Sequence, residues 1–139
     1  MSNIVYNIAK EKLSEGLLDL STADLWLMLT FGYVPSVDGD SFVIAATPYE
    51  VTGDGYSRVK LTNISLARDT VNNRMVLRAD DITWNQANFQ ADGAVIFVDT
   101  GNDATSMLIT FLDFDGSKRS QYTPFIIQWS AAEGILNIR

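Results

Sequence analysis

The chain has 139 residues, with ten lysine and arginine residues against seventeen aspartate and glutamate residues, no histidine and no cysteine. The formal net charge of −7 argues against partners that are nucleic acids or anionic membranes, because binding to either depends on basic side chains. The missing cysteine and histidine exclude disulfides, thiolate metal sites and the usual nucleophile–histidine pairs.

The N-terminal residues have no basic region followed by a long apolar region, so they do not resemble a secretory signal. No apolar run reaches the roughly 18 residues that span a bilayer. We therefore expect a protein that is made in a cytoplasm and is used there or carried out within a larger particle.

The first predicted element is a helix over residues 4–15, where apolar side chains recur every four residues. Ser2 or Asn3 can cap its start, and Gly16 can close its end. We expect residues 1–16 either to cover the open end of a sheet or to act as a partner-binding arm.

The next part of the chain predicts strands and one long loop. Residues 23–31 alternate leucine with other side chains, which is typical of a strand, while residues 42–46 suit a strand or a helical turn. Residues 32–40 have loop composition, and the length of this loop makes it a candidate for partner contacts. Two hairpins are predicted next: strands 49–51 and 56–61 around turn 52–55, and strands 64–67 and 75–79 around turn 69–73.

The centre of the chain is a predicted hairpin of two apolar runs, residues 94–98 and 107–112. Both faces of the first run are apolar, so we expect it to be covered on both sides. Before this hairpin we predict a short strand at 82–84 and irregular structure at 85–92. After it we predict a turn at 115–118, a strand at 122–129 with Pro124 at an edge or strand start, and a last strand at 135–138.

About eight to ten short strands at this spacing predict a mainly β fold. We expect a single domain over residues 1–139, an antiparallel β-sandwich or jelly-roll-like structure with a short N-terminal helix.

Acidic side chains are the only candidates for catalysis, since a glycosidase needs just two carboxylates at a set distance. The available ones are Asp80, Asp81, Asp99, Asp113 and Asp115. Most lie beside turn glycines or at strand ends, where aspartate is favoured for bonding to the backbone. We expect no enzymatic activity and no catalytic residues.

Metal and cofactor sites are also not expected. Residues 113–116 begin like an acidic calcium loop but lack later acidic ligands, and residues 38–40 match such a loop less well. Gly53 and Gly55 flank Asp54 without the lysine of a phosphate-binding loop. All three segments are interpreted as turns.

Aromatic residues provide the candidates for binding. Trp26 and Trp129 alternate within apolar strands and should be packed, whereas Trp84 has polar neighbours and is the one expected to be exposed and able to stack on a sugar. Tyr and Arg also suit protein interfaces. The predicted interface residues are Tyr33, Pro35, Tyr49, Tyr56, Arg58 and Trp84.

Several segments spread along the chain carry a resemblance. They are Ile4-Val5-Tyr6-Asn7, Gly32-Tyr33-Val34-Pro35, Tyr49-Glu50-Val51-Thr52-Gly53-Asp54-Gly55-Tyr56, Ala79-Asp80-Asp81-Ile82-Thr83-Trp84, Gly93-Ala94-Val95-Ile96, Asp99-Thr100-Gly101 and Gln128-Trp129 with Gly134-Ile135-Leu136. Together they resemble small structural proteins of bacteriophage virions, in particular capsid decoration (cement) proteins.

The resemblance implies a β-sandwich or jelly-roll that forms an oligomer, usually a trimer, on the capsid surface. It implies binding between capsomers, with the major capsid protein as partner, and no catalysis. The alternative is a carbohydrate- or receptor-binding β-sandwich module of a phage tail.

Overall fold

The structure is a computed structural model that describes residues 3–130 and 133–138. Its elements are β1 (Ile4–Val5), α1 (Asn7–Ser14), β2 (Leu25–Thr30), the 3-10 turns η1 (Val43–Ala45) and η2 (Thr47–Tyr49), β3 (Val59–Lys60), β4 (Ser65–Asp69), β5 (Arg74–Arg78), β6 (Ile82–Val98), β7 (Met107–Ile127) and β8 (Leu136–Ile138). None of the helices within these residues is long and apolar enough to cross a membrane.

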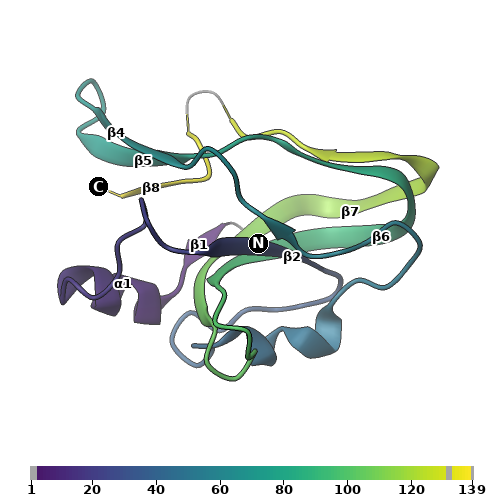
Figure 1. Ribbon diagram of the computed structural model, residues 1–139, viewed down its shortest axis with the longest axis horizontal. Helices are drawn as coiled ribbons and strands as arrows, with labels where there is room; N and C mark the ends of the chain where they lie inside the picture. The colour runs from purple at the N-terminus through teal and green to yellow at the C-terminus, as the bar shows by residue number, and fades with distance from the viewer. Residues whose placement is uncertain (1–2, 131–132, 139) are drawn as a thin grey trace.

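The strands form two antiparallel sheets, of five strands in the order β1-β7-β6-β2-β3 and of three strands in the order β4-β5-β8. Figure 1 shows the smaller sheet above the larger one, with α1 and the 3-10 turns on the lower side. The predicted mainly β, sandwich-like fold with a short N-terminal helix is thus confirmed.

The long hairpin of β6 and β7 connects the layers. Its register runs from Ile82 opposite Ile127 to Val98 opposite Met107, and it folds over along its length (Figure 1). Gly93 lies at a register shift, where an added Cβ would be 2.7 Å from the Phe111 ring, so a close approach requires glycine there.

The predictions of irregular structure at 85–92 and a turn at 115–118 are wrong, since both segments lie within β6 and β7. The turn-forming residues lie at local irregularities within the strands. Gln86 has a φ of +50° and Asp115 a φ of +57°. Such bulges bend a hairpin without ending it. Near Pro124, β7 pairs with β6 on one side and with no strand of the described residues on the other. Pro124 thus lies at an edge, as predicted.

The first apolar run is buried on both faces, as predicted. Ala94 and Ile96 belong to the larger core, which fills the space between the two sheets. Val95 and Phe97 belong to a second core on the opposite face of the five-stranded sheet, together with Tyr6. This strand needs cover on both sides because neither of its faces is polar.

The helix is shorter than predicted. It begins after Tyr6, which makes no side-chain cap, and residues Ile4–Val5 instead pair with β7 as β1. Of the two predicted caps, Asn3 accepts a hydrogen bond from the backbone of Asp113 at 2.7 Å, and Ser2 lies outside the described residues. Gly16, with a φ of +74°, follows the helix end as predicted.

The predicted 49–61 hairpin is wrong. Within residues 42–46, Val43–Ala45 form the helical turn η1, and η2 follows. Only β3 is a strand in this segment, and it pairs with β2. Gly53 has a φ of +155°, and an added Cβ would lie 2.4 Å from the backbone oxygen of Asn88. The glycines therefore let this loop lie directly against β6. The hairpin of β4 and β5 is present as predicted.

Candidate functional site

Four of the six predicted interface residues form two ring pairs. Tyr33 and Tyr49 are in ring contact at 5.7 Å, and Tyr56 stacks on Trp84 at 6.4 Å. Their exposure differs widely. Tyr49 is 44% exposed, Pro35, Tyr56 and Arg58 are half-buried, and Tyr33 and Trp84 are buried.

The predicted exposure of Trp84 is wrong, since the side chain is only 4% exposed. Its indole N–H donates to the backbone oxygen of Ser57 at 2.8 Å, and its ring meets Phe89 and Phe125 edge-on. Because β6 continues through this region, Trp84 faces the core between the sheets while its polar neighbours face solvent. A buried ring is not available for stacking on a sugar. Trp26 and Trp129 pack against the cores, as predicted.

Tyr33 is part of a hydrogen-bonded chain beneath the N-terminal segment. The Tyr6 hydroxyl donates to the Tyr33 hydroxyl at 2.9 Å, and Tyr33 donates to Asp40 at 2.6 Å. Asp40 also accepts the backbone N–H of Ser36. Burial, with the hydrogen bond to Asp40, raises the pKa of Tyr33 well above its ordinary value, so the hydroxyl stays protonated. These hydrogen bonds hold residues 33–40 against the N-terminal segment.

Arg58 ties the loop before β3 to the loop between β6 and β7. Its guanidinium donates to Glu50 at 2.9 and 3.0 Å and to Asp103 at 2.8 and 3.0 Å, and it lies 5.5 Å from the ring centre of Phe97. The Tyr56 hydroxyl also donates to Glu50. The hydrogen bonds from Arg58 lower the pKa of Asp103. The charged groups of Arg58, Glu50 and Asp103 bond to one another, so their role in this structure is to hold the two loops together.

An apolar surface lies on the connection between β2 and β3. Five of the nine large hydrophobic side chains that are exposed among the described residues belong to it: Phe31, Val34, Phe42, Ile44 and Tyr49, with exposed fractions of 45%, 72%, 37%, 53% and 44%. We call these five residues the 31–49 surface. Sequence reasoning found Tyr49 and the contact-prone loop 32–40, which contains Val34, but missed Phe31, Phe42 and Ile44, because apolar residues in a connection resemble core residues.

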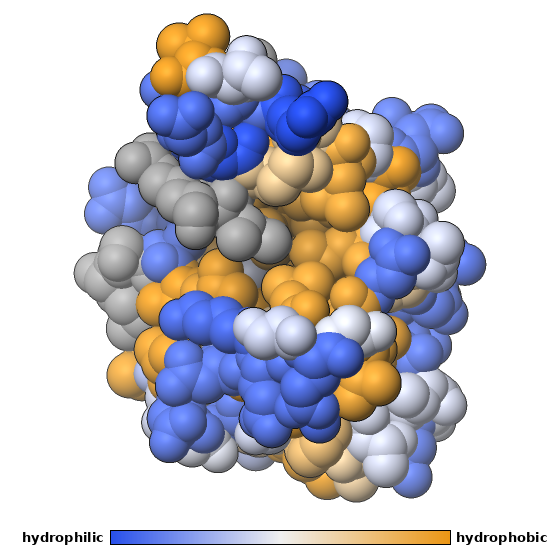
Figure 2. Space-filling view, turned by 90° about the vertical axis from the view of Figure 1, so that its left-hand side faces the viewer, coloured by the Kyte–Doolittle hydropathy of each residue, from blue (hydrophilic) through white to orange (hydrophobic). Residues whose placement is uncertain are grey.

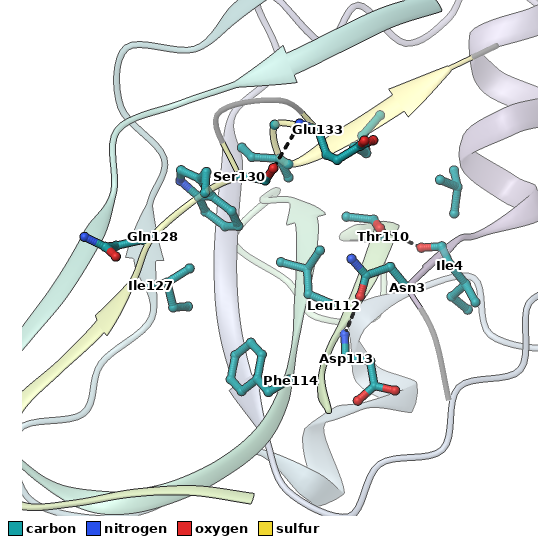
Figure 3. A pocket seen from close by; sticks show the side chains of 15 residues that line it. Asn3, Ile4, Thr110, Leu112, Asp113, Phe114, Ile127, Gln128, Ser130 and Glu133 are labelled. Atoms are coloured by element: carbon teal, nitrogen blue, oxygen red, sulfur yellow. Dashed lines mark hydrogen bonds between the residues drawn. The ribbon is translucent and has the colours of Figure 1, made fainter. Parts of the chain in front are cut away.

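A hollow of about 530 Å³ opens at the side of the sandwich. Its floor is apolar and includes the core residues Leu112, Ile127 and Leu136. Figure 2 shows orange apolar residues at the bottom of a hollow between polar rims, and Figure 3 shows Asn3 bonded to Asp113 at its edge. The hollow separates β1 and β7 on one side from the start of β8 on the other.

Four of the five aspartates considered for catalysis accept hydrogen bonds within the fold. Asp80 accepts from Thr62 and Asn63, whereas Asp81, Asp99 and Asp113 accept backbone N–H groups from Trp129, Gly101 and Asp115 respectively. The bonds of Asp99 and Asp113 come from the backbone two residues further on, which is the structural role expected of aspartate at turns. Within residues 3–130 and 133–138, no three acidic side chains are grouped so that they could hold a metal ion.

Comparison of the chain with family models, with curated proteins and with solved structures finds no match.

Proposed function

We propose that this chain is a structural protein of a bacteriophage virion, a capsid decoration (cement) protein that stabilises the head by binding between capsomers. It is made in the host cytoplasm and acts on the capsid surface. Its partner is the major capsid protein, and it forms a homo-oligomer, with a trimer favoured. It has no enzymatic role. The resemblance of its sequence segments to small virion proteins supports this assignment.

The observation that carries the proposal is the 31–49 surface. Exposed apolar side chains gain free energy when association removes them from water, so several of them on one connection favour a site of association. Here five large apolar side chains are exposed along a single connection, which itself is held in place by the bonds of Tyr33 and Arg58. A rigid apolar surface suits a protein that acts by burying area against its neighbours.

The experiment compares the unmodified protein with two variants by analytical ultracentrifugation and by binding to empty capsid shells. Val34→Glu combined with Ile44→Glu places two charges on the 31–49 surface and should abolish both self-association and shell binding. Val71→Glu is the matched control, because Val71 is 87% exposed in the turn between β4 and β5. A strictly monomeric protein that mass spectrometry does not find in virions would contradict the proposal.

The alternative, a carbohydrate- or receptor-binding module of a phage tail, was expected to use Trp84. The burial of that side chain removes the observation on which the alternative depended. A glycan panel followed by tryptophan fluorescence separates the two roles, since a decoration protein should give flat titrations with every glycan.

A further inference from the structure

The 31–49 surface lies on a connection that has acidic but no basic side chains. Asp38 and Asp40 are the charged residues of this connection. Asn7 donates to Asp38 and Tyr33 donates to Asp40, so uncharged groups make these bonds, and neither carboxylate forms an ion pair with the described residues. A partner that covers the five apolar side chains should therefore bring positive charge beside them.

A hollow of about 390 Å³ on β7 carries the opposite charge. Its lining includes the core residues Phe125 and Ile127, and its lining residue Ile126 is 54% exposed. Lys118 and Arg119 also line it, and both side chains are exposed. Neither side chain forms a hydrogen bond or an ion pair within the part of the chain that the structure describes. We call this the β7 hollow. It suits a partner that is both apolar and acidic.

Contacts between two identical surfaces are unfavourable here. If the 31–49 surfaces of two copies met, Asp38 and Asp40 would face the same aspartates, and two β7 hollows would bring four basic side chains together. Like charges placed together in an interface cost free energy. The 31–49 surface of one copy against the β7 hollow of the next instead joins apolar to apolar groups and acidic to basic ones. A contact between two different surfaces generates a ring or a filament, whereas a two-fold dimer uses the same surface twice.

The two surfaces are also placed as a ring requires. Figure 1 shows the connection between β2 and β3 on the lower side of the molecule and the second half of β7 on the upper side. The surfaces approach each other at Arg119, which also lines a hollow with Phe31 and Tyr49. Each subunit of a closed ring has two contact surfaces that converge towards the rotation axis.

We propose that the 31–49 surface of one copy binds the β7 hollow of a second copy, and that this head-to-tail contact closes the oligomer into a ring. The exposed apolar side chains cover the lining of the hollow, and Asp38 and Asp40 lie beside Lys118 and Arg119 of the neighbour. This rests on the homo-oligomer of the proposed function and identifies the second surface that such an oligomer uses.

The first test compares full-length variants by analytical ultracentrifugation. The unmodified protein should assemble beyond a dimer. Lys118→Glu with Arg119→Glu should weaken the association at least about tenfold, because it makes both sides of the contact acidic. The matched control is Lys60→Glu with Arg68→Glu, which reverses one lysine and one arginine at exposed positions outside both surfaces and should leave the association unchanged.

The second test mixes two defective variants. Val34→Glu with Ile44→Glu damages the 31–49 surface and keeps the β7 hollow, whereas Lys118→Glu with Arg119→Glu does the opposite. Each variant alone should be monomeric at a concentration at which the unmodified protein is assembled. An equimolar mixture should form a heterodimer and nothing larger, because one intact contact remains between the two kinds of chain.

Three results overturn the proposal: an unmodified protein that does not assemble beyond a dimer, a hollow variant that associates as tightly as the unmodified protein, or a mixture that stays monomeric. Mass spectrometry of virions separates this outcome from failure of the proposed function. A protein that is found in virions but gives one of these results keeps the virion role and loses the ring contact. A protein that passes both association tests but is absent from virions keeps the ring contact and loses the virion role.

Discussion

The ion pairs of Arg58 allow a quantitative prediction. Arg58→Met keeps the aliphatic length of the side chain but removes four charge-assisted hydrogen bonds of 2.8–3.0 Å. The three side chains are between 23% and 35% exposed, so the pairs are neither fully buried nor on the open surface. An exposed pair contributes about 0.2–1 kcal/mol, and breaking a buried one costs about 3–5 kcal/mol. We expect Arg58→Met to lower the free energy of unfolding by about 2 kcal/mol at pH 7.

The pH dependence gives a second readout of the same contact. The hydrogen bonds from Arg58 hold the pKa of Asp103 below its ordinary value of 3.8. Because the folded-state pKa is depressed, this contribution is present above the unfolded value and is lost as the pH falls through the folded one. The difference between the unmodified protein and the variant should therefore be constant from neutral pH down to about pH 4 and shrink below it.

Urea unfolding followed by tryptophan fluorescence at pH 7 and at about pH 3 measures both effects. Lys60→Met is the matched control, since the Lys60–Asp24 pair is exposed and its loss should cost less than about 1 kcal/mol. Equal losses for the two variants at pH 7, or a difference for Arg58→Met that does not shrink in acid, would refute the reasoning.

Three further substitutions test the core, the tyrosine chain and the close approach to β6. Trp84→Ala should cost about 3–5 kcal/mol in urea unfolding, because it empties a buried aromatic cluster; a near-neutral result would mean that the ring is exposed after all. Tyr33→Phe removes two hydroxyl hydrogen bonds of a buried side chain and should cost about 1–2 kcal/mol, while Tyr122→Phe removes one bond of an exposed side chain and should stay within about 0.5 kcal/mol; similar values for the two would contradict the role of the buried tyrosine chain. Gly53→Ala should lower the melting temperature more than Gly101→Ala, since both have positive φ but only Gly53 would also bring a Cβ against a backbone oxygen; the reverse order would exclude the close approach.

Some of the fold could be predicted because the determining interactions are local. Residues 94–98 are apolar on both faces, and this alone indicated the two-sided burial that the two cores provide. The hairpin of β4 and β5 was predicted from its turn residues and strand composition. The end of the helix at Gly16 was also predicted, since a residue after a helix often needs a positive φ.

The candidate surfaces were predicted only in part. Tyr49 and the contact-prone loop 32–40 were found, but the exposure of Phe31, Phe42 and Ile44 was not, because residue type alone does not determine whether an apolar side chain is buried or exposed. The hollow of about 530 Å³ has no sequence signature. Its floor joins residues of β7 and β8 that come together only when the hairpin bends.

The amino-acid sequence by itself determined the mainly β character, the antiparallel central hairpin and the absence of histidine and cysteine chemistry, because these depend on composition and on short-range periodicity. Only the tertiary structure decided that the turn-like residues 85–92 and 115–118 continue two long strands, that Trp84 is buried, and that Arg58 joins Asp103, 45 residues away. These outcomes depend on which segments pack together, and packing energies between distant residues override local preference.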